Sequence, residues 1–281
     1  MLSLSVTTLL LISLPLIAIL ALALAYWRYT REVPVLMYHR VADVPRNRLA
    51  VPPAMFAAQM AYLKEHGYHT ISLAALNAYY LVHAPLPARP IVITFDDGFV
   101  DNYTTALPIL RQHGFTACVC VISDWVDREN DWEDFPGKAA AHTMNWEQLH
   151  GWQQAGMGIV CHTANHPRLP RLSDEDITRE FSESKRALQE QLGQPMDFLC
   201  YPYGDFDARV QRLAREVGFK GALAIFERVP LWHFDPYAIR RIAISSRQPL
   251  SEFARKVSPW HFLFLLLRIT ERGLKRVKSE G

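Results

Sequence analysis

The sequence lacks a large net charge. Its 281 residues carry 30 Lys and Arg against 28 Asp and Glu, which leaves a formal net charge of +2. Proteins that bind nucleic acid carry a concentrated positive surface, and those that bind single strands add aromatic side chains among the basic ones. Neither pattern is present, so the composition argues against nucleic acid as a partner.

Cysteine is also scarce, with four residues in the whole chain. Cys118 and Cys120 lie two apart on a predicted strand and therefore point the same way, while Cys161 and Cys200 each precede a candidate site segment. We interpret all four as small buried hydrophobic residues and not as a disulfide framework. With 50% hydrophobic residues and no internal repeat, the chain has the composition of one α/β domain of barrel size.

Residues 1–27 contain no charged side chain. Because about 20 apolar residues can cross a bilayer, this run predicts a transmembrane helix. A cleaved signal peptide is the alternative, but the run is long and lacks a basic start. We therefore predict a single-pass protein of a bacterial-type inner membrane with an extracytoplasmic catalytic domain. The arginines that follow the run favour the opposite, cytoplasm-facing orientation.

The C-terminal segment from Trp260 to Lys278 begins apolar and ends basic. This pattern is typical of an amphipathic helix on an anionic membrane surface, although a final helix packed on the domain fits it equally well. The predicted organisation is an anchor at 1–27, a catalytic domain at 33–245 and a helical, basic amphipathic tail at 246–281.

Between these ends, strand-like and helical segments alternate, which predicts a parallel sheet covered by helices. The predicted strands are 33–41, 91–95, 116–122, 157–163, 197–204 and 220–225. The predicted helices are 55–68, 102–114, 145–156, 174–193 and 207–218. Each of these helices ends at or beside a glycine, as expected where the chain turns into a left-handed cap.

Polar residues follow several of the predicted strands at the point where each strand ends. His39, the pair Asp96 and Asp97, His162 and Tyr203 all occupy such positions. The carboxyl ends of parallel strands meet on one rim of a (β/α) barrel, where such barrels build their active sites. We therefore expect these side chains to lie close together.

Two adjacent aspartates at the end of an apolar strand need a positive partner, because like charges repel and burial is costly. His162 and His166 are four residues apart, so one turn places both imidazoles on the same side. Taken alone this histidine pair would be weak evidence, but two histidines and one aspartate make a metal-binding triad. The second aspartate would then be available to accept a proton from water, which is the arrangement of a hydrolase.

Three motifs carry a family resemblance. "TFDDG" at 94–98, "HTANHP" at 162–167 and "YPYG" at 201–204 resemble, in order and spacing, the motifs of the polysaccharide deacetylases, which are carbohydrate esterase family 4 or the NodB homology domain. The resemblance covers about residues 33–245. "VPVLMYHRV" near its start and "IRRIAI" near its end are similar to the branch that deacetylates exopolysaccharides.

The resemblance implies a distorted (β/α) TIM-like barrel with fewer than eight repeats, a divalent metal, most commonly zinc, and removal of N-acetyl groups from sugars. It also implies roles for individual residues. Asp96 matches the general base, Tyr203 matches the residue whose backbone amide holds the oxyanion, and the metal ligands match Asp97, His162 and His166.

The sequence departs from the family pattern twice. Cys200 stands where many members have an arginine that orients the catalytic aspartate, so Arg240 or Arg241 would have to replace it. The late histidine that serves as general acid in many members is also missing. The remaining candidates for the acid are His39, His233 and His261, of which His39 alone follows a predicted strand of the barrel.

The sequence thus predicts a metal-dependent deacetylase of an N-acetylated polysaccharide or a lipid-linked amino sugar in the cell envelope. One alternative is a glycan-binding barrel without catalysis. Another is a deformylase or deacetylase of a polyprenyl-linked sugar at the cytoplasmic face. The sequence leaves the oligomeric state open.

Overall fold

The computed structural model describes residues 32–130, 141–225 and 234–258, together with six isolated positions nearer the chain ends. Residues 33–250 form one compact unit, and 1–32 with 251–281 form a second. The predicted site residues all belong to the first unit, whose architecture is described next.

The first unit is built on a parallel sheet of eight strands in the described part of the chain. The strand order is β10-β1-β5-β6-β7-β8-β9, and β4 pairs with the start of β5. The bounds are β1 (Val35–Tyr38), β4 (His69–Thr70), β5 (Pro90–Phe95), β6 (Cys118–Val121), β7 (Gly158–Cys161), β8 (Phe198–Cys200), β9 (Gly221–Leu223) and β10 (Ile242–Ala243). Two short strands, β2 (Arg40–Val41) and β3 (Ala50–Val51), pair separately.

The central strands are buried on both faces, which explains why they are continuous apolar runs and do not alternate. One face lines an apolar interior that includes Val92, Cys120, Cys200 and Leu223. All four cysteines are buried and free, as the sequence predicted.

The sheet curls until its two edges approach each other. At the end of β9, Leu223 forms a parallel bridge with Ile239, and the Ala224 amide donates to the Ile239 carbonyl at 2.8 Å. Three residues later the same segment becomes β10, which pairs with β1. The curled parallel sheet confirms the predicted fold class at this level and is consistent with a distorted (β/α) barrel.

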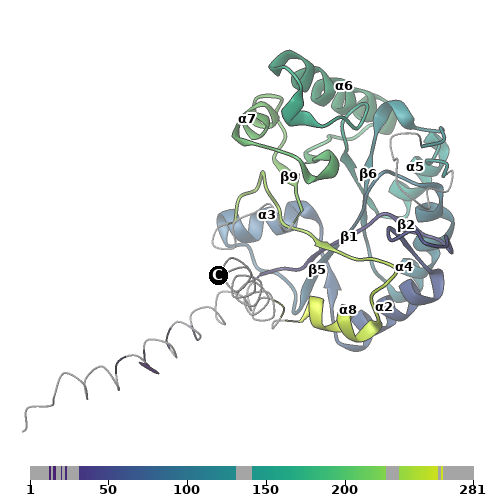
Figure 1. Cartoon of the computed structure of the whole chain (residues 1–281), viewed down its shortest axis with the longest axis vertical. Coiled ribbons are helices and arrows are strands. Elements are labelled where there is room, and N and C mark those ends of the chain that lie inside the picture. Colours follow the sequence, from purple (N-terminus) through teal and green to yellow (C-terminus); the bar gives the residue numbers. More distant parts are fainter. Residues whose placement is uncertain are drawn as a thin grey trace, which may run out of the picture. The chain divides into compact units, whose positions relative to one another are not determined.

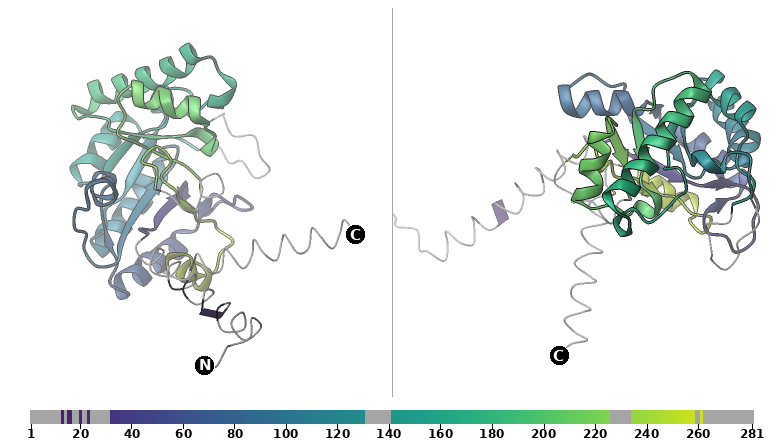
Figure 2. Two further views of the ribbon diagram at one scale, coloured as in Figure 1. Left: turned by 90° about the vertical axis from the view of Figure 1, so that its left-hand side faces the viewer. Right: turned by 90° about the horizontal axis from the view of Figure 1, so that it is seen from above.

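Helices cover the outside of the curled sheet (Figure 1). Their bounds are α2 (Pro53–Glu65), α3 (Leu73–Val82), α4 (Leu107–His113), α5 (Trp146–Gln154), α6 (Asp174–Leu192) and α7 (Ala208–Glu216). Helices α6 and α7 are neighbours, as two further views also show (Figure 2). A short π-helical turn at Asn102–Ala106 leads into α4.

The predicted glycine caps are confirmed. The five glycines at the helix ends have φ between 65° and 84°, the left-handed region in which a side chain is costly. They are Gly67, Gly114, Gly156, Gly193 and Gly218.

Some elements differ from the prediction. The predicted strand 33–41 divides at His39 into β1 and β2, and the apolar segment that forms α3 was not predicted as a helix. Strand β10 is only two residues long, too short for a periodic signal.

The predicted membrane location is wrong. Among the residues that the structure describes, none of the helices is both long and apolar enough to cross a bilayer. The prediction rested on the apolar composition of 1–27, and composition alone does not establish a continuous spanning helix. Most of 1–27, and of the predicted amphipathic helix from Trp260 to Lys278, lies outside the described residues. The domain boundaries at 33 and 245 remain predictions.

A substitution at Gly221 tests how closely the segments around β9 are packed. A Cβ atom at this position would lie 2.7 Å from the Pro236 carbonyl oxygen and 3.0 Å from the Phe198 ring. We expect Gly221→Ala to lower the free energy of unfolding by about 1–3 kcal/mol, because backbone and core must shift to admit it. Urea unfolding measures the change, with the exposed neighbour substituted in Lys220→Ala as the control. Equal midpoints for the two variants would contradict the close approach.

Candidate active site

The two adjacent aspartates diverge as β5 ends. The Asp96 amide still donates to the Tyr38 carbonyl of β1 at 2.9 Å, so this residue continues the sheet. Asp97 then has φ of 72°, and the chain turns sharply at Gly98. Both carboxylates are almost fully buried, at 5% and 3% exposure, yet they face different partners.

Asp97 faces the two histidines that the sequence singled out. Its Oδ1 lies 3.5 Å from His162 Nε2 and 3.7 Å from His166 Nε2. The two imidazole rings have centroids 4.8 Å apart and are nearly perpendicular. The structure therefore brings together the three side chains predicted as metal ligands.

The orientation of His162 is fixed by the neighbouring strand. Its Nδ1 lies 2.9 Å from the Cys200 carbonyl oxygen, which can only accept a hydrogen bond, so Nδ1 carries the proton. When the ring is neutral, its lone pair is therefore on Nε2, the atom that faces Asp97. Burial lowers the pKa of His162, but the nearby Cys200 and Asp97 raise it more, so its net pKa lies above the ordinary value. A metal-binding histidine commonly has this arrangement, with the second nitrogen bonded to a backbone carbonyl.

His166 is presented by a tight loop. Its amide donates to the Thr163 hydroxyl at 2.9 Å, so the Thr163 side chain caps the loop. Burial, together with the nearby His162, lowers the pKa of His166 to about 3. The ring is therefore neutral at physiological pH, the form in which histidine binds a cation.

The donor set fits a divalent cation. One ligand atom from each of Asp97, His162 and His166 lies within 4.8 Å of the others, and all three side chains are buried. A second group, Asp96 with His162 and Cys200, meets the same distance criterion. The guanidinium of Arg241 lies 3.2 Å from the Cys200 sulfur and donates hydrogen bonds to Asp96. A cation bound by this second group would therefore lie beside a fixed positive charge. We therefore assign the candidate site to the first group.

Asp96 forms a buried two-bond ion pair with Arg241. The guanidinium Nη1 donates to Oδ1 at 2.5 Å and Nη2 donates to Oδ2 at 2.9 Å. Burial raises the pKa of Asp96, but the Arg241 charge and hydrogen bonds lower it more, so the net pKa lies below its ordinary range. Asp96 is therefore a carboxylate. Its Oδ1 also accepts from the Cys200 thiol, so a lone pair is left on Oδ2.

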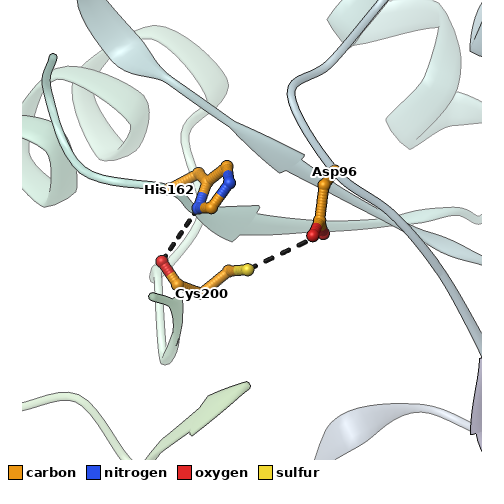
Figure 3. Close-up of side chains that lie close together, drawn as sticks. All are labelled: Asp96, His162 and Cys200. Atoms are coloured by element: carbon orange, nitrogen blue, oxygen red, sulfur yellow. Dashed lines mark hydrogen bonds between the residues drawn. The ribbon is translucent and has the colours of Figure 1, made fainter. Parts of the chain in front are cut away.

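Arg241 resolves the first departure from the family pattern. The sequence offered Arg240 or Arg241 as a replacement for the missing arginine, and the structure selects Arg241. Cys200 contributes differently. Figure 3 shows Cys200 hydrogen-bonded to both other drawn residues, through its carbonyl to His162 and through its sulfur to Asp96. The distance from the sulfur to Asp96 Oδ1 is 3.6 Å.

His39 follows β1 and is half-buried near the two aspartates. Its carbonyl accepts a hydrogen bond from the Asn102 side chain at 2.8 Å. Its Nδ1 is buried and has no hydrogen-bond partner among the residues that the structure describes. When protonated, His39 lowers the pKa of both aspartates, which places it within electrostatic reach of them. Of the other two histidines considered for the acid, His233 is outside the described residues and His261 belongs to the second unit.

Tyr203 lies on the rim of the site. It occupies the short turn Pro202–Gly204 with φ of 57°, and its ring centroid is 4.5 Å from that of His166. The ring is 36% exposed and lies under the Arg168 guanidinium, 4.3 Å away. The turn therefore brings the Tyr203 backbone beside the histidine loop.

Comparisons with known proteins identify similar proteins in one family. The family model for polysaccharide deacetylases matches residues 83–222, a range that contains Asp96, Asp97, His162, His166 and Tyr203. His39 and Arg241 lie outside the matched range.

Individual relatives extend over more of the chain. The Bacillus subtilis protein YxkH, named for the same family, is 26% identical over 222 residues, which is 79% of this chain and 75% of that protein. The poly-β-1,6-N-acetyl-D-glucosamine N-deacetylase of Escherichia coli K12 is 30% identical over 119 residues, 42% of this chain and 17% of that protein. The structure of the Streptococcus pyogenes deacetylase PplD, solved with acetate, superposes with a TM-score of 0.71 at 26% identity, covering 81% of this chain and 98% of that one.

The ion pair of Asp96 with Arg241 predicts a strong, non-additive effect on stability. Arg241→Met leaves a buried carboxylate without its partner, so we expect the free energy of unfolding to fall by about 3–5 kcal/mol. Asp96→Asn combined with Arg241→Met removes both charges and should cost clearly less than Arg241→Met alone. Urea unfolding of the two variants and the parent measures the coupling. A double variant at least as unstable as the single one would contradict it.

Proposed function

Because this chain belongs to the polysaccharide deacetylase family, we propose that it removes N-acetyl groups from an N-acetylated polysaccharide in a metal-dependent hydrolysis. The prediction of a hydrolase that cleaves non-peptide carbon–nitrogen bonds is confirmed by the family match and the named relatives. The proposal adds the metal, the roles of the residues and the kind of glycan. The main support for this proposal is that two imidazoles converge on the Asp97 carboxylate, while Asp96 beside it is held by another partner.

Asp97, His162 and His166 would hold the ion, and zinc suits two imidazoles and one carboxylate. A bound divalent ion supplies Lewis acidity, which polarises a carbonyl and makes water a better nucleophile at neutral pH. Contacts within the protein orient these donors, because the Cys200 carbonyl fixes His162 and the Thr163 hydroxyl fixes the His166 backbone.

Asp96 acts as general base. It accepts one proton from the attacking water while the water oxygen bonds to the acetyl carbon. Arg241 donates one hydrogen bond to each Asp96 oxygen, and the Cys200 thiol donates a second to Oδ1, so the lone pair for the proton remains on Oδ2. The role requires the ionised form, which the low pKa of Asp96 maintains.

The carbon–nitrogen bond then breaks, and the sugar nitrogen leaves as an amine once it is protonated. His39 is positioned to supply this proton, since it follows the neighbouring strand and its Nδ1 has no partner within the described residues. The backbone amide of Tyr203 would stabilise the negative oxygen of the tetrahedral intermediate. The products are acetate and a free amino sugar.

The substrate class follows from the relatives. The Escherichia coli relative is named for a β-1,6-linked N-acetylglucosamine polymer, and a further relative from Cryptococcus neoformans is named a chitin deacetylase. We propose a polymer containing N-acetylglucosamine, of the kind made in exopolysaccharide metabolism. The exposed Tyr203 ring at the rim would contact such a sugar.

Two substitutions separate the base from the metal ligand. Asp96→Asn should reduce acetate release from N-acetylglucosamine oligomers by about 10²–10⁴-fold, because the base is lost. Its zinc affinity should remain close to that of the parent. Asp97→Asn should weaken zinc binding by more than the roughly 10–100-fold typical of losing an outer partner of a ligand. Acetate assays and zinc competition with a chelator measure the two effects.

The control is Asp176→Asn, which replaces an exposed carboxylate on α6. It should change neither acetate release nor zinc affinity. Chelator treatment of the parent should abolish acetate release, and added zinc or cobalt should restore it. If the metal-loaded parent bound glycan but released no acetate from any oligomer, and Asp96→Asn bound equally well, the non-catalytic alternative would replace this proposal.

A further inference from the structure

The loop between the two histidines is held by a carboxylate from outside the sequence motif. Glu180 of α6 accepts hydrogen bonds at Oε2 from the amides of Ala164, at 3.0 Å, and Asn165, at 2.8 Å. Its Oε1 accepts a third bond from the Asn165 side chain at 3.2 Å. One ionised side chain thus binds two successive backbone N–H groups of the three-residue segment that separates His162 from His166.

The loop has an unfavourable backbone that needs such support. Thr163 has φ of 65° and His166 has φ of 58°, in the left-handed region that non-glycine residues seldom occupy. In this conformation the amides of residues 164, 165 and 166 all need acceptors on one side of the loop. Glu180 serves the first two, and the Thr163 hydroxyl serves the third.

The loop is also joined to the segment after β6, by two backbone bonds and by the Asn165 side-chain amide, which donates to Asp124 Oδ2 at 3.2 Å. The amides of Ser123 and Asp124 donate to the carbonyls of Thr163, at 3.2 Å, and Ala164, at 3.1 Å. These two backbone bonds do not depend on a side chain. Substitution of Glu180 therefore removes one of two anchors and leaves the loop attached to the sheet.

We propose that Glu180 is a positioning residue that sets the relative placement of the His162 and His166 imidazoles for the cation. This inference depends on the proposed function, because that proposal is what assigns a metal ion to the site. Glu180 acts only through the loop amides, because its hydrogen bonds reach Ala164 and Asn165 and not the histidine rings. The strength of its two backbone bonds comes from the full charge of the carboxylate.

Metal affinity measures this role without an activity assay. Glu180→Ala should weaken zinc binding by about 10–100-fold, the range seen when an outer partner of a metal ligand is lost. The visible absorption of the cobalt-substituted protein should shift, because the two imidazoles no longer hold the same geometry. Glu180→Gln retains a neutral oxygen that can accept the two amides and should recover most of the affinity.

Glu183→Ala is the matched control, since Glu183 is an exposed carboxylate less than one turn further along the same helix. It should leave zinc affinity and the cobalt spectrum unchanged. Urea unfolding of the metal-free proteins separates a general loss of stability from a change at the site. If Glu180→Ala fails to fold, Glu180→Asp decides, because its shorter side chain withdraws the carboxylate and should lower zinc affinity at least about tenfold.

Zinc affinity and cobalt spectrum equal to those of the parent, in Glu180→Ala or in Glu180→Asp, would overturn the role of Glu180. This failure is distinct from failure of the proposed function. A parent protein that binds zinc but releases no acetate contradicts the deacetylase proposal, while the variant affinities still decide the role of Glu180. A parent that binds no divalent ion overturns both.

Discussion

The buried ion pair between Asp96 and Arg241 is the interaction on which the interior of this barrel depends. The Arg241 guanidinium also donates to the Ala224 carbonyl and the Thr94 hydroxyl, both at 3.2 Å, and lies against the Cys200 sulfur. It therefore ties together β5, β8 and the end of β9 from a position just before β10. Since arginine does not lose its proton in proteins, its partner must remain ionised. The same contact that closes the sheet thus fixes the charge of the residue proposed as base.

This ion pair explains why a cysteine can stand at position 200. The family resemblance implied an arginine at this position that would orient the catalytic aspartate. Here the arginine arrives from the opposite edge of the sheet, and a small residue at position 200 leaves room for it in the packed interior. The carbonyl of Cys200 meanwhile orients His162, which does not depend on the identity of the side chain. One short strand thus supports both the base and a candidate metal ligand.

Much of this arrangement could be predicted from sequence, because it depends on local signals. The alternation of apolar strands and helices, the glycine caps and the polar residues after strands are all readable within windows of a few residues. What the sequence left open depends on contacts between distant segments. Arg240 and Arg241 are neighbours, and only the path of the chain into the two-residue strand β10 decides which of them reaches Asp96, 145 residues away. Glu180 was missed for the same reason, since a glutamate on an exposed-looking helix gives no signal of the loop that it binds. The membrane prediction failed differently, because it treated apolar composition as evidence for a spanning helix.

In the described part of the chain, four of the eight non-glycine residues with positive φ belong to the site. Asp97, Thr163, His166 and Tyr203 all have positive φ although none is glycine, and each such conformation costs of order 1–3 kcal/mol. The cost persists only where surrounding contacts determine the conformation. Those contacts come from the rigid part of the fold, as the strand partners of β5 and the carboxylate of α6 show. The helices and strands, and not the loops themselves, therefore hold the strained turns in place, so that the side chains of the site converge on one point.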